Sequence, residues 1–188
     1  MKKSLTQEQT CQSTIKDQEA ERIAAARRNP QAFGDLYDQY APSIYRYLLS
    51  RLGNVEEARD VTSQTFLKAV EKFPRYTHHG YFSAWLFSIA RSKYVDQVRR
   101  SKHGVETIPE EQVDPQPDPL TEVVSTERMA ELMKCIHALA SEEQEVLRLR
   151  YVADLSFTEM AELLLKSEGA VKKSFYRLLA RLQSQLEA

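Results

Sequence analysis

A stretch of sixteen residues, GVETIPEEQVDPQPDP at positions 104–119, divides the chain into two parts. It contains four prolines and five acidic residues, and its apolar residues follow no regular period. Proline removes a backbone hydrogen-bond donor and like charges repel one another, so such a segment neither continues a helix nor joins a hydrophobic core. We therefore expect a flexible acidic linker between two small domains.

The domain boundaries follow from changes in composition. Residues 1–18 are polar and offer little to bury, which predicts a disordered N-terminal extension. The first domain is expected over residues 19–102, the linker over 103–119 and the second domain over 120–188. A chain of 188 residues is long enough for two such domains, each with a modest core.

Before the linker, apolar residues recur every three or four positions, the period of an amphipathic helix. This pattern predicts a helix that ends at Gly53, a second from about Val55 to Phe73, a loop over residues 75–81 and a third helix from Phe82. The residues expected to face the core are Phe33, Leu36, Tyr37, Tyr40, Ile44, Leu48, Leu52, Ala58, Thr62, Phe66, Ala69, Val70, Phe73, Phe82, Trp85, Leu86, Ile89 and Tyr94.

The helical period returns after the linker, at Leu120. Ser141 with Gln144 has the spacing of an N-terminal capping box for a helix through about residue 152, and Ser156 with Glu159 repeats it. Ser167 precedes a further helix. No useful run alternates apolar and polar residues as a strand would, so the expected fold class is all-α, with two small helical domains.

The last two predicted helices have the layout of a helix-turn-helix. A short helix, a connection of about three residues and a longer helix with cations on its outer face are typical of this DNA-binding motif. The outer face of the last helix would present Lys172, Lys173, Tyr176 and Arg177 to DNA. The alternative is an amphipathic helix whose basic face is simply solvated.

Charge is distributed unevenly along the chain. The formal net charge is only -1, but residues 91–103 and 166–181 each hold five Lys or Arg against one acidic residue. Cations along a helix suit a phosphate backbone, and the nearby aromatic residues Tyr76, Tyr81 and Phe82 are placed to stack on unpaired bases. The alternative is a solvated basic face, and for Trp85 itself we favour a role in the core.

Several classes of protein are disfavoured. Cys11 and Cys135 are too few for a disulfide framework or a zinc site, and His78 and His79 lack ligand spacing, so we expect neither metal nor cofactor. No apolar run approaches the ~20 residues of a membrane span, and the polar start lacks a signal peptide. These features predict a soluble cytoplasmic protein.

The acidic residues Glu142, Glu143 and Glu145 lie together near the start of a predicted helix. We interpret them as partners of the helix dipole rather than as catalytic acids. Since no nucleophile, base and orienting group occur together, the sequence does not indicate an enzyme.

Four stretches in order resemble the extracytoplasmic-function (ECF) sigma factors of the sigma-70 family. They span about residues 20–186 and read AFGDLYDQYAPSIYRYLLSRLG, EEARDVTSQTFLKAVEKF, FSAWLFSIARSKYVDQVRR and SEEQEVLRLRYVADLSFTEMAELLLKSEGAVKKSFYRLLARL. The resemblance implies a region 2 domain that binds core RNA polymerase and opens the promoter at the -10 element. It also implies a region 4 helix-turn-helix domain that reads the -35 element.

The resemblance also implies partners and site residues. The partners are bacterial RNA polymerase core, through its beta-prime clamp and beta subunits, promoter DNA and an anti-sigma factor. The positions matching polymerase docking are Asp60, Gln64 and Phe66. Those matching the -10 contacts are Arg75, Tyr76, His78, Tyr81, Arg91, Ser92, Tyr94, Arg99 and Arg100. Those matching the -35 contacts are Ser167, Glu168, Gly169, Lys172, Lys173, Tyr176 and Arg177.

The docking helix departs from the family pattern at two positions. Arg59 stands where an acidic residue is usual, and Ser63 where Gln is usual. The lost negative charge should weaken docking on a basic clamp surface. One hypothesis is that phosphorylation of Thr62 or Ser63 restores it, because a phosphate adds about -1.5 to -2 charges.

Three departures affect the DNA contacts. Ser92 replaces the usual Asn, Leu165 a common Gly and Ser174 a common Arg, so no promoter preference transfers from the family. Two rival functions remain at this point. One is a free-standing helix-turn-helix regulator whose N-terminal helices bind a ligand or dimerise. The other is an enzyme acting on nucleic acid, against which the lack of clustered metal-binding carboxylates argues.

Overall fold

The computed structural model describes residues 19–78, 81–103 and 122–187. Every regular element within these ranges is a helix, as the sequence predicts. The predicted extension at residues 1–18 and nearly all of the predicted linker lie outside the described residues.

The N-terminal half is built on three long helices. A helical segment over residues 19–28 and the short turn η1 (Pro30–Ala32) lead into α2 (Phe33–Leu52) and α3 (Val55–Lys72). The turn η2 (Phe73–Arg75) then leads toward α4 (Phe82–His103). Helix α2 ends at Gly53, whose left-handed φ of 69° closes the helix at little cost because glycine has no Cβ.

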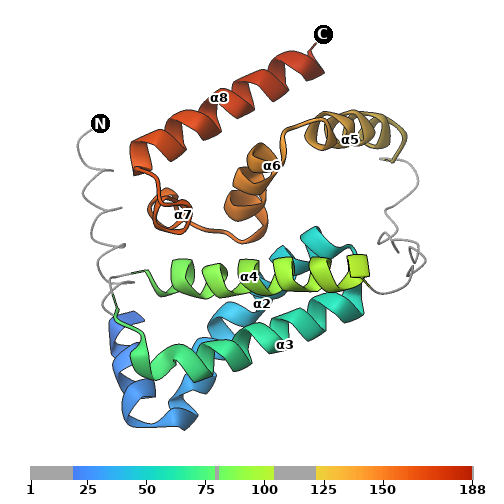
Figure 1. The fold of residues 1–188 in the computed structure, drawn as a ribbon. Coiled ribbons are helices and arrows are strands. Elements are labelled where there is room, and N and C mark those ends of the chain that lie inside the picture. The colour runs from blue at the N-terminus through green and yellow to red at the C-terminus, as the bar shows by residue number, and fades with distance from the viewer. Residues whose placement is uncertain (1–18, 79–80, 104–121, 188) are drawn as a thin grey trace.

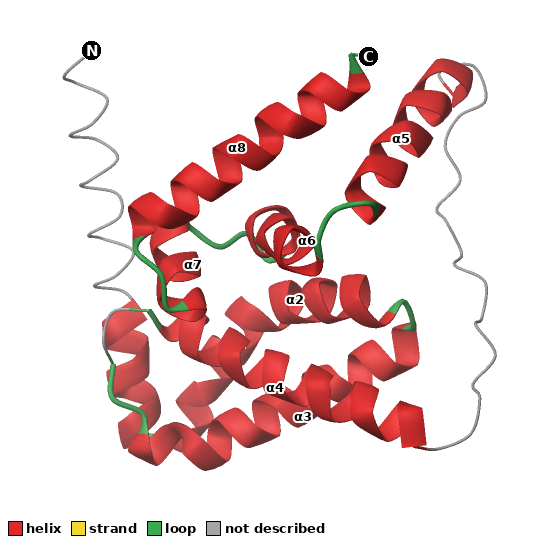
Figure 2. Ribbon diagram, turned by 45° about the horizontal axis from the view of Figure 1, so that its top comes forward, coloured by secondary structure: helices red, strands yellow, loops and turns green. Residues whose placement is uncertain are grey.

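The C-terminal half forms a second layer. It comprises α5 (Glu122–His137), α6 (Ser141–Leu147), the π-helical turn η3 (Arg148–Val152), α7 (Phe157–Leu164) and α8 (Glu168–Leu186). Figures 1 and 2 show this layer lying over α2 and α4. The two layers touch where α7 meets α4 and where η3 meets α2.

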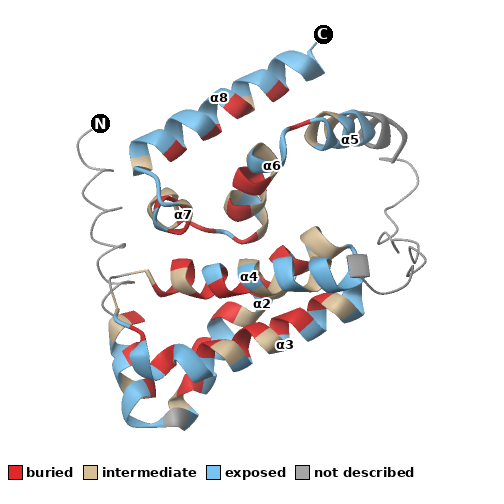
Figure 3. Cartoon of the chain, in the orientation of Figure 1, coloured by how far each residue is buried: buried red, intermediate tan, exposed pale blue. Residues whose placement is uncertain are grey.

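Aromatic side chains fill the core of the N-terminal layer. Tyr47, Phe82 and Phe87 are fully buried, and the rings of Tyr47 and Phe87 meet edge to face, with centroids 5.4 Å apart. Burying one such side chain contributes about 1.5–3 kcal/mol. Figure 3 shows the buried positions of α2, α3 and α4 facing one another.

A buried carboxylate fixes the start of α4. The Glu19 carboxylate accepts hydrogen bonds from the Tyr40 hydroxyl at 2.7 Å and from the Phe82 backbone N–H at 2.9 Å. Burial and the neighbouring Glu19 charge raise the pKa of Tyr40, so its hydroxyl stays protonated and donates. The helical segment over residues 19–28 is thereby joined to α4.

The capping predictions have mixed outcomes. The Ser156–Glu159 box is confirmed, since the Glu159 N–H donates to the Ser156 hydroxyl and the Ser156 N–H to the Glu159 carboxylate. The Ser141 prediction is wrong by one residue, because the N-cap is Ala140. Its N–H donates to the Glu143 carboxylate at 3.3 Å, while alanine itself offers no side-chain acceptor.

Two residues expected in the core lie at the surface. Tyr37 is 45% exposed and Val70 is 50% exposed. Both lie beside buried positions on the same helix, at the edge of the apolar face, where periodicity alone separates core from rim poorly.

We expect Leu165→Gly to raise the free energy of unfolding by about 0.5–1 kcal/mol. Leu165 closes α7 with a φ of 54°, a left-handed conformation that costs an L residue with a Cβ about 1 kcal/mol or more, and its side chain is 91% exposed. Urea unfolding measures the change.

Lys166→Gly is the matched control for this substitution. Lys166 is the exposed neighbour, and its φ is not positive, so added glycine flexibility should lower stability there. A loss of stability in Leu165→Gly would contradict the backbone argument and show that the leucine side chain stabilises the fold.

Candidate nucleic-acid interface

An aromatic pocket lies where the loop after α3 meets the start of α4. It has a volume of about 290 Å³ and is lined by Arg75, Tyr76, Thr77, Tyr81, Ala84, Trp85, Ser88 and Glu162. The rings of Tyr76 and Trp85 lie 4.5 Å apart, and the Tyr76 hydroxyl is 3.0 Å from His78 Nδ1. The loop and the first turns of α4 thus form one aromatic wall beside an exposed Arg75.

The chemistry of this pocket suits an unpaired nucleic-acid base. Aromatic faces stack on bases at about 1–3 kcal/mol per base, and an arginine beside them attracts the phosphate. Tyr76 is only 8% exposed, so it acts as a wall that holds Trp85 rather than as a freely accessible ring. Burial raises the pKa of Tyr76, which keeps the ring neutral.

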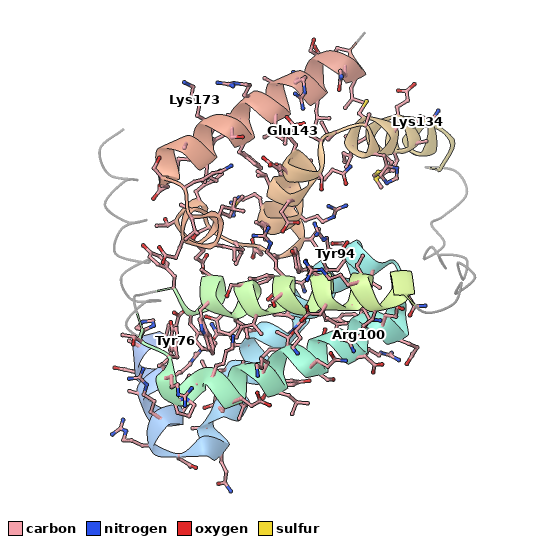
Figure 4. The ribbon with its side chains drawn as sticks, in the orientation of Figure 1. Tyr76, Tyr94, Arg100, Lys134, Glu143 and Lys173 are labelled. Carbon is pink, nitrogen blue, oxygen red and sulfur yellow. The ribbon has the colours of Figure 1, made fainter. Side chains whose placement is uncertain are left out.

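The residues assigned to the -10 element lie in the loop before α4 and along α4 itself. Arg75, Ser92, Arg99 and Arg100 are exposed, His78, Tyr81, Arg91 and Tyr94 are half-buried, and Tyr76 is buried. Figure 4 shows Tyr76 near the start of α4 and Arg100 near its other end. The predicted contacts therefore extend over the length of this helix.

Several of these side chains already have partners within the chain. The Arg51 guanidinium lies 4.2 Å from the centre of the Tyr94 ring. Arg91 forms an ion pair with Glu145 of α6 at 3.4 Å, and Arg100 donates to the Gln64 side chain at 3.4 Å. Nucleic acid would have to compete for Arg91 in particular, because its partner is charged.

The helix-turn-helix prediction is confirmed in its geometry. Helix α8 follows α7 after a three-residue connection, and the Ser167 hydroxyl caps it by accepting from the Ala170 N–H at 3.2 Å. Val171 and Phe175 lie on the inner side of α8 and are buried. Figure 4 shows Lys173 on the side of α8 that faces away from α6 and α7.

Most residues assigned to the -35 element lie on this outer side. Ser167, Gly169, Lys172, Lys173, Tyr176 and Arg177 are exposed and Glu168 is half-buried. The Lys172 ammonium pairs with the Glu168 carboxylate at 2.6 Å, and this hydrogen bond raises the pKa of Lys172. Lys172 therefore stays charged and can turn toward phosphate.

Helix α3 presents the predicted docking residues unequally. Asp60 is exposed and Gln64 half-buried, but Phe66 is only 5% exposed and packs against Tyr37 with ring centroids 4.7 Å apart. Phe66 is therefore a core residue in this structure, and it supports α3 from beneath. A groove of about 600 Å³ runs beside it, lined by Tyr37, Asp38, Ala41, Pro42, Tyr45, Arg59, Thr62 and Ser63.

The two candidate phosphorylation sites differ in access. The Thr62 hydroxyl is buried and donates to the Ala58 carbonyl at 2.7 Å, so a phosphate there would need this turn to open. Ser63 is exposed and its hydroxyl donates to the Arg59 carbonyl. Arg59 itself pairs with Glu56 at 2.8 Å, which offsets part of the extra positive charge.

Sequence reasoning missed the acidic residues that meet the N-terminal layer. Glu145 is buried between α6 and the N-terminal helices, so its assignment as an ordinary dipole partner is wrong. Glu162 lines the aromatic pocket from α7. No local signal marks either residue, because each depends on how the two layers pack.

Other kinds of site find no support in the described residues. Within residues 19–78, 81–103 and 122–187, no three His, Cys, Asp or Glu side chains are grouped as metal ligands would be. Helices long and apolar enough to cross a membrane are also absent from this part of the chain.

Comparison with known protein families finds one match for each half of the chain. The family described as Sigma-70 region 2 matches residues 36–104, and that described as Sigma-70, region 4 matches residues 129–182. The first match covers most of α2 and all of α3 and α4, and the second covers α7 and most of α8, the two helices of the helix-turn-helix.

Curated relatives from several bacteria are similar over most of the chain. The ECF RNA polymerase sigma factor SigW of Bacillus subtilis is 30% identical over 177 residues, covering 88% of this chain and 95% of SigW. SigD of Mycobacterium tuberculosis is 32% identical over 180 residues, covering 90% of this chain and 82% of SigD. BldN of Streptomyces coelicolor is 36% identical over 155 residues, and the match spans 80% of this chain and only 59% of BldN.

Solved structures share the fold. CnrH, solved in complex with the cytosolic domain of CnrY, has a TM-score of 0.59 at 22% identity, covering 88% of this chain and 95% of that chain. The sigma factor RpoE of Bartonella quintana was solved with the anti-sigma factor NepR. It has a TM-score of 0.57 at 20% identity, and the match covers 83% of this chain and 97% of that chain.

The order of the two matched regions and the relatives that align across both point to one family. Members of this family are transcription initiation factors that act in promoter recognition, and no catalytic chemistry is part of that role. The chain belongs to the ECF RNA polymerase sigma factors of the sigma-70 family.

Proposed function

We propose that the aromatic pocket at the start of α4 captures an unpaired base of the -10 element. The Tyr76–Trp85 wall, with ring centroids 4.5 Å apart beside the exposed Arg75, is the observation that carries this proposal. Flipping a base out of a duplex costs a few kcal/mol, which stacking and phosphate contacts offset. The exposed Arg99 and Arg100 continue the positive track along α4.

Helix α8 reads the -35 element as duplex DNA in this proposal. Its capped N-terminus and exposed Lys172, Lys173 and Arg177 have the layout of a recognition helix in a major groove. Ser174 is also exposed on this helix, so a serine hydroxyl replaces the guanidinium that the family favours there. The -35 sequence preference of this protein should differ accordingly.

The outer face of α3 docks on core polymerase, at the beta-prime clamp. Asp60 supplies a negative charge on this face, and the groove beside Ser63 adds a concave surface. The protein acts in the bacterial cytoplasm, where its polymerase is, and has no enzymatic activity of its own. An anti-sigma factor is a further partner, since RpoE of Bartonella quintana was solved with one.

Binding of the -10 strand should quench the fluorescence of Trp85, the single tryptophan of the chain. A stacked base changes the environment of the indole directly. We expect a saturable quench when single-stranded DNA is added in excess, and an affinity several-fold lower in Arg75→Ala.

Lys173→Ala is the matched control for this measurement. It removes one positive charge from exposed α8 without touching the pocket. Equal losses of affinity in Arg75→Ala and Lys173→Ala would mean that the strand responds only to net charge. That result would contradict a specific pocket.

Substitution of Lys172 or Arg177 by Ala should flatten the salt dependence of promoter duplex binding. Each residue that neutralises a phosphate contributes about one unit to the slope of log K against log salt. Binding isotherms at several salt concentrations measure this slope. If it stays unchanged in both variants, neither residue contacts phosphate.

Ser63→Glu should tighten binding to core polymerase. The exposed Ser63 lies on the docking face, and an added negative charge there replaces part of what Arg59 removes. We expect a several-fold higher affinity by titration with sigma-free core, and no change for Ser184→Glu, the same substitution on exposed α8. Tight binding by the unphosphorylated wild type would contradict the phosphorylation hypothesis.

A further inference from the structure

A second cavity adjoins the loop between α3 and α4. It has a volume of about 600 Å³, which is the size of a site for a small organic molecule. The helical segment over residues 19–28, the first turn of α2, the end of α3 and the turn η2 all contribute to its walls. The cavity is distinct from the aromatic pocket, although it lies next to it.

The floor of this cavity is apolar and largely aromatic. The rings of Phe33 and Phe73 meet edge to face with centroids 5.1 Å apart, and Phe73 stacks on Tyr76 at 6.3 Å. Val70 adds an aliphatic side chain that is 50% exposed. An apolar ligand in the cavity would cover this side chain, which the helical period places in the core.

The rim of the cavity is basic. Arg27 and Arg75 both line it and both are exposed, and the described residues that form its walls include no acid. Arginine offers a planar set of N–H donors that matches a carboxylate or a phosphate. An apolar floor beside two arginines therefore favours a ligand that has an apolar body and one anionic group.

Arg27 also holds the loop in place. Its guanidinium donates a hydrogen bond to the backbone carbonyl of Tyr76, which joins the helical segment over residues 19–28 to the loop. Hydrogen bonds between two charged groups are stronger than those to a neutral carbonyl. An anion in the cavity would therefore compete well for Arg27 and release this carbonyl.

The loop lies between the cavity and the aromatic pocket. Arg75, Tyr76 and Thr77 line both, and the Tyr76 ring lies 4.5 Å from that of Trp85. Figure 4 shows Tyr76 at this position, near the start of α4. A ligand that releases the Tyr76 carbonyl loosens the wall that holds Trp85. A ligand that pairs with Arg75 also takes the cation that a phosphate of the -10 strand would need.

We propose that this cavity binds a small amphipathic anion and that its binding weakens capture of the -10 base. The anionic group lies at Arg27 and Arg75, and the apolar body covers Phe33, Phe73 and Val70. The effect on the -10 base rests on the proposed function of the aromatic pocket, whereas binding of the ligand does not. By linkage, the -10 strand weakens binding of the ligand by the same factor.

Titration of the full chain with octanoate, followed by calorimetry, tests the ligand site. Octanoate carries one carboxylate on an alkyl chain, and we expect saturable binding at a single site. The alcohol 1-octanol lacks the charge and should bind about ten-fold more weakly. Inorganic phosphate lacks the alkyl chain and should also bind about ten-fold more weakly.

Two pairs of variants locate the ligand. Arg27→Gln removes one cation of the rim and should weaken octanoate binding about ten-fold. Arg28→Gln is its control, because the exposed Arg28 donates to the Ala24 carbonyl and does not line the cavity. Val70→Glu places a negative charge at the rim and should weaken octanoate binding as well. Leu67→Glu makes the same change at an exposed position of α3 outside the cavity and should not.

Quenching of Trp85 by a short mixed-sequence single strand tests the coupling. In saturating octanoate, the strand should bind wild type at least about five-fold more weakly. The same concentration of 1-octanol controls for a solvent effect and should leave the affinity of the strand unchanged. Octanoate should also have no effect on strand binding in Val70→Glu, because this variant does not take up the ligand.

The outcomes separate this proposal from the one on which part of it rests. The ligand site would be overturned if octanoate did not saturate, if 1-octanol or inorganic phosphate bound equally well, or if Val70→Glu and Leu67→Glu lost equal affinity. Octanoate binding with no change in strand affinity would overturn the coupling. If single strands failed to quench Trp85 even without octanoate, the -10 pocket would be wrong, and calorimetry would still decide the ligand site.

Discussion

The burial of one side of α4 determines what the rest of the N-terminal domain can do. Phe82, Leu86 and Phe87 are fully buried against α2 and α3. With that side fixed, the rotation of α4 is fixed too, and its cations at Arg99 and Arg100 must point outward. The same packing brings Trp85 against Tyr76 at the start of the helix. Core formation and the nucleic-acid surface are therefore two consequences of one helix orientation.

This orientation also gives the C-terminal domain a place to dock. The remaining side of α4 offers Ser83 and Arg91 to acids on α7 and α6. Charges that suit a phosphate backbone suit a carboxylate equally, because both are anions with oxygen acceptors. The chain therefore satisfies part of its own basic surface at Arg91 in the absence of DNA.

Much of the fold could be predicted because it depends on local sequence. Helical period, Gly53 and the Ser156–Glu159 box each act within a few residues and correctly placed helices α2, α3, α7 and α8. Errors arose where tertiary packing decides. Tyr37 and Val70 lie at the rims of their helices' apolar faces and are exposed, whereas Phe66, which the helical period also places in the core, is buried as predicted. Near Ser141, the cap lies one residue earlier than predicted, so that Glu143 rather than Gln144 accepts from the N-cap N–H.

The candidate site was predictable only in part for the same reason. Basic residues on α4 and α8 could be identified from charge and spacing, since solvent-exposed positions are simply those left over from the core. Glu145 could not, because its partners Tyr47 and Arg51 lie about a hundred residues earlier in the chain. Its neighbours Glu142, which is exposed, and Glu143, which is half-buried, share its residue type and its helix, so residue type alone does not identify the buried acid.

The most direct test of the account is reconstitution with sigma-free bacterial core polymerase, followed by transcription from the region upstream of the chain's own gene. We expect the protein to co-elute with core on a sizing column and the complex to initiate at a defined start site. Failure to associate with core under any charge state of the α3 docking face would contradict it.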